Sequence, residues 1–187
     1  MKSRQNERKS ENKPYRKAVS NSDQDRHIID RDTPIDGGVF FAEGATEAIH
    51  VDSRKYSKLM TLYEECKKSA SRNGVIRKQL VLNAVYDIVA KSMPTQSDTA
   101  VKRIIREYGV ANEINIALDI FLIEGIGLSR HYALACTALL ELFKKDGLLR
   151  GSPSIDLKRV GSGNHVWCRY KSSKGEVYVL DAAKKYF

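Results

Sequence analysis

The sequence lacks any continuous apolar segment long enough to span a membrane. No run of 18 or more apolar residues occurs among its 187 residues, whereas a transmembrane helix needs about 20. The first 30 residues also lack the apolar core of a secretory signal. We therefore expect no membrane span and a cytoplasmic protein, although export through a signal of another kind stays open.

Cysteine is scarce, and its three residues are Cys66, Cys136 and Cys168. Their number is odd, and their spacing has none of the pairs that disulfide frameworks and zinc sites use. Cysteines on apolar helix faces usually act as small hydrophobic residues. We expect free, buried thiols and no metal site, and the sequence also has no acidic loop of the EF-hand type that binds calcium.

The signatures of nucleic-acid readout are also missing, although the formal net charge is +9. The sequence has no arginine-rich helix, no pair of exposed aromatic residues in an RNA-binding motif and no zinc-finger spacing. Residues 1–35 carry nine Lys or Arg and six Asp or Glu, and the remaining excess of positive charge is spread over the rest of the chain. This distribution favours acidic surfaces in general and no specific nucleic acid.

Large apolar side chains are few in residues 1–35. Such a segment cannot bury enough surface to offset the entropy lost on ordering, so we expect a flexible basic and polar tail. Residues 36–187 are expected to form one folded domain. Residues 36–53 fit either a short strand or a segment packed over the core.

Helical periodicity dominates residues 53–123. Apolar residues recur at steps of three and four, and they predict helices over residues 53–73, 75–92, 97–109 and 112–123. Breaks at Asn73-Gly74, Pro94 and Gly109 separate these segments. The last helix is expected to be mostly buried, because residues 114–123 are nearly all apolar.

A fifth helix is predicted to begin at Ser129 and to end at Asp146-Gly147. Its apolar stripe contains Tyr132, Ala133 and Cys136, and Ser129 shares the face of that stripe because it precedes these residues by three, four and seven positions. His131 lies off the stripe, so we expect it to be exposed or to act only through a neighbour.

The period changes from 3.6 to 2 after Gly151, which predicts strands. Residues 165–170 and 177–180 alternate in polarity on either side of the turn Ser172-Ser173-Lys174-Gly175. If the turn centres on Ser173, His165 lies directly opposite Asp181, with Cβ atoms about 5 Å apart. A carboxylate at that distance would hold the imidazole.

Residues of this kind support covalent acyl transfer when they meet. A nucleophile at a helix N-terminus gains from free backbone N–H groups and from the positive end of the helix dipole. A histidine on a neighbouring strand serves as base and acid, and an aspartate fixes its tautomer. Trp167 shares a strand face with His165 and would form the wall of a substrate cleft or pack in the core.

The motifs of residues 75–187 together resemble the transglutaminase-like superfamily, whose members share the papain-like layout. Gly127-Leu128-Ser129 stands where the family has glycine, any residue and cysteine, His165-Val166-Trp167 matches its histidine motif, and Leu180-Asp181 matches its aspartate. The resemblance implies an α+β fold with a papain-like core, in which a helical N-terminal layer packs on a small C-terminal antiparallel sheet. It also implies catalytic roles for positions 129, 165 and 181, a protein or peptide substrate and no cofactor.

Ser129 departs from the family, because a cysteine-type acyl-transfer enzyme needs a thiol at this position. The serine is an engineered replacement, a natural loss that leaves a binding scaffold, or a working nucleophile; it is also a preferred helix N-cap residue, which needs no catalysis. We expect either an enzyme acting on amides, as a protease, glutamine deamidase or transglutaminase that serine leaves inactive, or an inactive module that binds a peptide or protein. The sequence indicates neither the substrate nor the oligomeric state.

Overall fold

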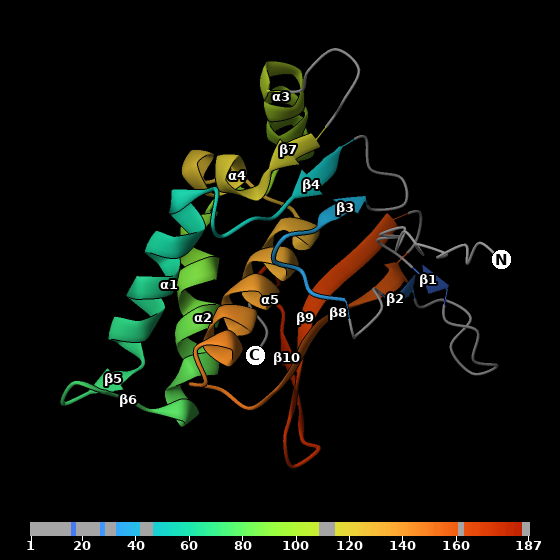
Figure 1. The fold of residues 1–187 in the computed structure, drawn as a ribbon. Coiled ribbons are helices and arrows are strands. Elements are labelled where there is room, and N and C mark those ends of the chain that lie inside the picture. The colour runs from blue at the N-terminus through green and yellow to red at the C-terminus, as the bar shows by residue number, and fades with distance from the viewer. Residues whose placement is uncertain are drawn as a thin grey trace, which may run out of the picture.

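Helices and strands both contribute to the fold, which is α+β as the sequence predicts (Figure 1). The computed structural model describes residues 16–17, 27–28, 33–41, 47–108, 115–160 and 163–184. Its helices are α1 (Ser57–Ser69), α2 (Lys78–Ser92), α3 (Asp98–Tyr108), α4 (Leu118–Glu124) and α5 (Ser129–Lys145). Its strands are β1 (Arg16–Lys17), β2 (His27–Ile28), β3 (Val39–Phe41), β4 (Ala48–His50), β5 (Ser71–Arg72), β6 (Val75–Ile76), β7 (Asn115–Ala117), β8 (Gly151–Val160), β9 (Gly163–Ser172) and β10 (Val177–Leu180). Most of the predicted tail, residues 1–35, lies outside the described residues.

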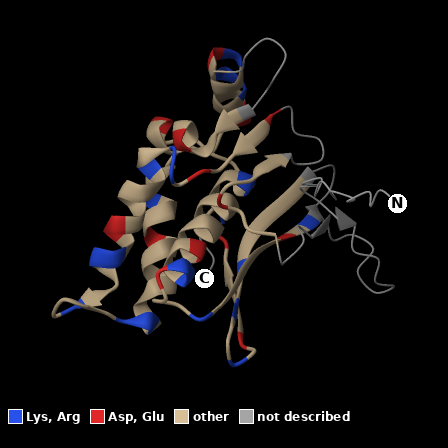
Figure 2. Ribbon diagram, in the orientation of Figure 1, with Lys and Arg blue, Asp and Glu red and all other residues tan. Residues whose placement is uncertain are grey.

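Helix α5 lies at the centre of the molecule. Helices α1, α2 and α4 contact it, and strands β8 and β9 pack against its other side (Figure 1). Residues 131–140 are consequently all buried, and the charged residues of α5 lie near its two ends (Figure 2). The sequence predicts a single apolar stripe, but neighbours surround the helix, so its middle is buried on every side.

The C-terminal sheet is antiparallel and has the strand order β10-β9-β8. The predicted hairpin is confirmed as β9 and β10, but its predicted register is wrong. Val179 pairs with Arg169 and Leu180 with Cys168, because the turn closes one residue later, between Ser172 and Glu176. If this register continued past Leu180, Asp181 would lie opposite Trp167, two residues away from His165.

A second sheet forms from β3, β4 and β7, in that order. Strand β7 runs parallel to β4 and pairs Ile116 with Ile49. The predicted helix over residues 112–123 is therefore wrong at residues 115–117, and α4 begins only at Leu118. The apolar run fits a buried strand as well as a buried helix, and pairing with β4 decides between them.

The connection between α1 and α2 is a short hairpin of β5 and β6. Asn73 and Gly74 form its turn with φ angles of 52° and 75°, which suit asparagine and glycine best among the residues. The break predicted there is confirmed. Helix α1 begins at Ser57, four residues later than the periodicity predicts, because residues 53–55 form a turn and Tyr56 is extended. Ser53 donates hydrogen bonds to the carboxylate of Asp36 through its N–H and its hydroxyl.

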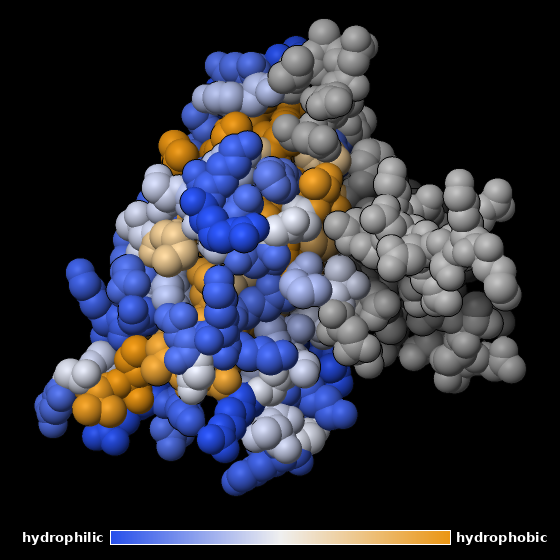
Figure 3. All heavy atoms as spheres, viewed as in Figure 1, coloured by the Kyte–Doolittle hydropathy of each residue, from blue (hydrophilic) through white to orange (hydrophobic). Residues whose placement is uncertain are grey.

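Polar residues cover most of the face shown in Figure 3, with apolar patches between them. The hairpin of β5 and β6 contributes one such patch, where Val75 is 56% exposed. In the part of the chain that the structure describes, no helix has the length and apolar character needed to cross a membrane.

Candidate functional site

His165 and Asp181 form a close pair on the C-terminal sheet. Nε2 of His165 lies 2.6 Å from Oδ2 of Asp181, and Oδ1 of the same carboxylate accepts a hydrogen bond of 3.1 Å from the backbone N–H of Lys184. Both side chains are largely buried, with exposures of 15% for His165 and 9% for Asp181. Two hydrogen bonds thus fix the carboxylate, and the carboxylate fixes the imidazole.

The bond to Asp181 determines the tautomer of a neutral His165. An ionised carboxylate can only accept hydrogen bonds, so Nε2 carries the proton and donates it. Nδ1 is then the basic nitrogen, and it has no hydrogen-bond partner among the described residues. An imidazole held in this way can take up a proton at Nδ1 while the carboxylate stabilises the resulting cation.

The His165–Asp181 contact forms although the two residues are not directly opposed. In the observed register they are diagonal neighbours, whose Cα atoms are separated by about 7–8 Å in an antiparallel pair. Asp181 lies just beyond the end of β10, where the chain turns at residues 182–184. The pair expected from the sequence therefore exists, but the turn after β10 makes it and direct cross-strand pairing does not.

Trp167 lies beside His165 on the same face of β9. The ring centroids are 5.9 Å apart with an interplanar angle of 31°, and Trp167 is half-buried. The indole therefore covers one side of the imidazole, as a wall of the site would.

Ser129 is the first residue of α5, which begins at the predicted position. The N-cap is Leu128, in an extended conformation with φ −116° and ψ 175°, so an N-cap role for Ser129 is wrong. Within the described residues, the Ser129 hydroxyl forms no hydrogen bond, and the backbone N–H groups of Ser129 and Arg130 have no acceptor. The first turn of α5 thus keeps two free donors next to this hydroxyl.

The structure distributes these four residues over three segments, which are α5, β9 and the turn that follows β10. Helix α5 packs against β9, which carries His165 and Trp167, while Asp181 lies beyond β10. No hydrogen bond joins Ser129 to His165 among the described residues. His165 contacts both Asp181 and Trp167, and Ser129 lies on the helix that packs against β9.

The loop between α2 and α3 connects the two halves of the site. Its Thr95 accepts a hydrogen bond of 3.0 Å from the N–H of Gly127, two residues before Ser129. Gln96 donates from Nε2 to the carbonyl of Ala183, two residues after Asp181, at 2.7 Å. Sequence reasoning missed Gln96, because a single glutamine in a loop carries no periodic signal.

Gly127 lies in a closely packed position. A Cβ here would lie 2.6 Å from Sδ of Met93 and 3.2 Å from Cβ of His131, so a larger residue would displace the Met93 side chain. The backbone of Met93 is itself held, since its carbonyl accepts a hydrogen bond from the hydroxyl of Tyr132. The glycine of the Gly-Leu-Ser motif thus lets the loop after α2 approach the start of α5.

A buried charged cluster lies behind Ser129. Arg130 donates to Oε1 of Glu47 through Nε, at 2.6 Å, and through Nη2. His131, fully buried, lies with Nε2 3.8 Å from the same oxygen, and Nδ1 accepts a hydrogen bond of 2.9 Å from the N–H of Leu128. Burial lowers the pKa of His131 well below its ordinary value, so the ring is neutral. The expectation that His131 is exposed is wrong, because Glu47 and, from α4, Phe121 pack against its ring.

The three cysteines are free and buried, as the sequence predicts. Burial raises the pKa of Cys66 and of Cys168 to about 12, and it raises the pKa of Cys136 well above the ordinary value of a thiol. A thiolate is the reactive form of cysteine. The native cysteines are therefore poor nucleophiles at neutral pH.

The chain matches no family model, and comparisons with curated proteins and with solved structures also find no match.

Proposed function

We propose that this chain has the papain-like core of the transglutaminase-like superfamily, and that its site is built for cysteine-type acyl transfer on protein or peptide amides. The observation that carries the proposal is the hydrogen bond of 2.6 Å between His165 and Asp181, on a sheet packed against the helix that begins with Ser129. A protease, a glutamine deamidase and a transglutaminase all use this chemistry.

Each residue has a defined role in the proposed reaction. A nucleophile at position 129 attacks the amide carbonyl, and Nδ1 of His165 takes its proton and returns it to the departing amine or ammonia. Asp181 keeps the imidazole in the required tautomer. The free N–H groups at the start of α5 are suited to stabilise the oxyanion that forms on the carbonyl oxygen. Water or a second amine then resolves the acyl intermediate.

Ser129 itself favours a second candidate, an inactive transglutaminase-like module that binds a peptide or protein. A serine hydroxyl is far from ionised at neutral pH, and a helix terminus supplies at most about 2 kcal/mol. We expect the chain with Ser129 to show no turnover, since full activation would depend on His165 alone. In this candidate the half-buried Trp167 forms part of the binding surface.

Substitution of Ser129→Cys tests the proposal. We expect iodoacetamide to alkylate this variant at pH 7 roughly tenfold faster than the variant that also carries His165→Gln, because a neighbouring imidazole lowers the pKa of a thiol. Asp181→Asn should give an intermediate rate. The measurement is the rate of alkylation by mass spectrometry between pH 5 and 9, followed by release of ammonia from a glutamine-containing peptide.

The original chain and Ser129→Ala serve as matched controls, and both should remain unlabelled because their three cysteines are buried. Equal rates with and without His165 would contradict the proposed base. A fast thiol without ammonia release or peptide cleavage would favour the binding module over the enzyme.

A further inference from the structure

A cavity of about 510 Å³ lies at the other end of the C-terminal sheet, between the start of α2 and the turn that joins β9 to β10. We call it the hairpin cavity. Residues from α2, from the segment before β8 and from the β9–β10 hairpin line it. Ser172, at this end of β9, lies seven positions after His165, which corresponds to about 23 Å along a strand. The hairpin cavity is therefore distinct from the site around His165.

The floor of the hairpin cavity is apolar and one wall is aromatic. Leu82, Leu149 and Tyr170 line it and are buried, while Tyr178 is 39% exposed. The rings of Tyr170 and Tyr178 have centroids 6.3 Å apart and an interplanar angle of 38°. Tyr178 thus presents part of its ring to solvent while the buried ring of Tyr170 supports it from below.

Three cationic side chains, Lys78, Arg150 and Lys174, line the same cavity. In the part of the chain that the structure describes, none of the three takes part in an ion pair, whereas Arg103 and Arg130 do. One carboxylate, that of Glu176, also lines the cavity, and its Oε2 accepts hydrogen bonds from the hydroxyls of Ser172 and Tyr178. Positive charge is therefore in excess.

The backbone holds Arg150 at the rim. The hydroxyl of Tyr170 donates to the carbonyl of Arg150. The next residue, Gly151, has a φ of 152°, and a Cβ there would lie 2.5 Å from the carbonyl oxygen of Lys171 and from the Tyr170 hydroxyl. Only glycine fits this close approach, so the position of Arg150 follows from the packing of β8 on β9.

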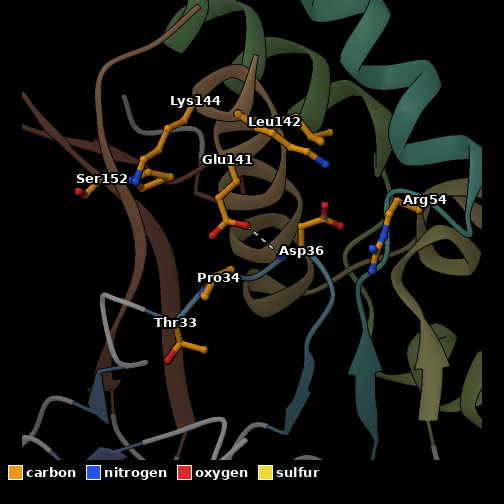
Figure 4. Close-up of a pocket in the computed structure, with 10 residues that line it drawn as sticks. Thr33, Pro34, Asp36, Arg54, Glu141, Leu142, Lys144 and Ser152 are labelled. Atoms are coloured by element: carbon orange, nitrogen blue, oxygen red, sulfur yellow. Dashed lines mark hydrogen bonds between the residues drawn. The ribbon is translucent and has the colours of Figure 1, made fainter. Parts of the chain in front are cut away.

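A second cavity, of about 570 Å³, has a different distribution of charge. It lies at the C-terminal end of α5, and Figure 4 shows the carboxylate of Glu141 projecting into it from the helix, with Lys144 and Arg54 farther out. Asp36 adds a second carboxylate and Lys145 a third cation, so positive charge exceeds negative charge here by less than in the hairpin cavity, which has three cations and one carboxylate. The negative end of the α5 dipole points to this cavity, whereas the positive end of α2 points to the hairpin cavity. Electrostatics therefore favour an anion more strongly in the hairpin cavity.

We propose that the hairpin cavity binds a small molecule that carries a phosphate group on a planar ring, of the size of a mononucleotide. Arg150 presents a planar guanidinium that binds phosphate oxygens in pairs, and Lys78 and Lys174 add positive charge. The exposed ring of Tyr178 offers a face on which a planar group stacks. Ligand pockets usually have volumes of about 300–1,000 Å³, a range that includes this one.

Titration of the full chain with adenosine 5′-monophosphate, followed by calorimetry or by amide chemical shifts, tests the proposal. We expect saturable binding with a Kd below about 1 mM, and binding at least about tenfold weaker for inorganic phosphate and for adenosine, because each lacks one of the two contacts. Arg150→Gln and Tyr178→Leu should each weaken binding about tenfold. The affinity should also fall severalfold as the salt concentration rises from about 50 to 200 mM, because salt screens the attraction between the phosphate and the cationic side chains.

The matched control is the double substitution Lys144→Gln and Lys145→Gln, which removes the same kind of charge from the cavity at the end of α5. It should leave the affinity unchanged. Absence of saturable binding at millimolar nucleotide would overturn the proposal. So would a loss in the control as large as that of Arg150→Gln, because binding would then depend only on the overall charge of the chain.

Discussion

His131 takes an unusual part in capping the start of α5. It is the third residue of the helix, and its Nδ1 accepts a hydrogen bond from the N–H of Leu128, the N-cap. Glu or Gln usually accepts this bond in a capping box. The ring of Phe121, with its centroid 4.0 Å away, packs on the imidazole. His131 therefore fixes the backbone that leads into Ser129.

Replacement of His131 separates hydrogen bonding from packing. We expect His131→Leu to lower the free energy of unfolding by about 1–3 kcal/mol, because it leaves the partly buried N–H of Leu128 without its acceptor. His131→Gln should cost less, since its side-chain oxygen replaces Nδ1. Urea denaturation at pH 7 measures both, and equal losses would show that the hydrogen bond contributes little.

At the residue scale, the sequence predicted the start of α5 at Ser129 from local periodicity, and the structure confirms this start. The contact of His165 with Asp181 also forms, but the turn after β10 makes it and the predicted register of the hairpin does not. Gln96 and Glu47 could not be identified in this way. Each reaches the site from a segment far away in the chain, and only the tertiary fold determines which distant loops come together.

Helix and segment ends in this molecule depend on carboxylates from other elements. The N-cap of α1, Tyr56, forms no side-chain cap bond. Asp119 of α4 replaces it, because its oxygens accept hydrogen bonds of 2.6 Å from the N–H of Lys58 and 3.0 Å from that of Leu59. The carboxylate is 5% exposed, and burial raises its pKa. Such a cap between helices α4 and α1 fixes their relative position.

Removal of this cap should loosen α1. We predict that Asp119→Ala lowers the free energy of unfolding by about 2–4 kcal/mol, because two N–H groups lose their acceptor. Asp119→Asn keeps one acceptor oxygen and should cost about half as much. Thermal and urea denaturation give the magnitude, and amide exchange at Lys58 and Leu59 shows whether the loss is local. Unchanged exchange in the alanine variant would contradict the capping role.

Element boundaries show where sequence reasoning stops. The breaks at Asn73-Gly74 and before Pro94 are local, and the structure has helix ends close to both. Strand β7 and the register of β9 with β10 are not local, because each depends on a partner strand or on the exact closure of a turn. A shift of the turn by one residue moves every cross-strand pair, and periodicity alone does not detect it.

At the scale of the whole molecule, Glu141 joins the segment before β3 to the core. Its Oε1 accepts a hydrogen bond of 2.8 Å from the N–H of Ile35, and its Oε2 accepts one of 2.8 Å from the N–H of Asp36. Burial nevertheless raises the pKa of Glu141 from its ordinary value of 4.5 to about 7. The folded protein therefore binds a proton more tightly than the unfolded chain at this residue.

This difference makes the stability depend on pH. The contribution of Glu141 is fully present below pH 4.5 and is lost as the pH rises through about 7, because the unfolded chain ionises more easily. We predict that the free energy of unfolding falls between these values by on the order of 1–3 kcal/mol more in the original chain than in Glu141→Gln. Urea denaturation across pH 4.5–8 measures it, and parallel curves for the two proteins would exclude this role.

The burial of α5 on every side has a consequence for how the protein could change over evolution. Between residues 131 and 140 no position faces solvent, so an altered side chain there must be matched by an altered residue in an adjacent helix or strand. Substitutions in this stretch would therefore be fixed in pairs. Single substitutions would be tolerated more easily at the two ends of the helix, near Ser129 and near Lys144, where a changed side chain contacts few neighbours.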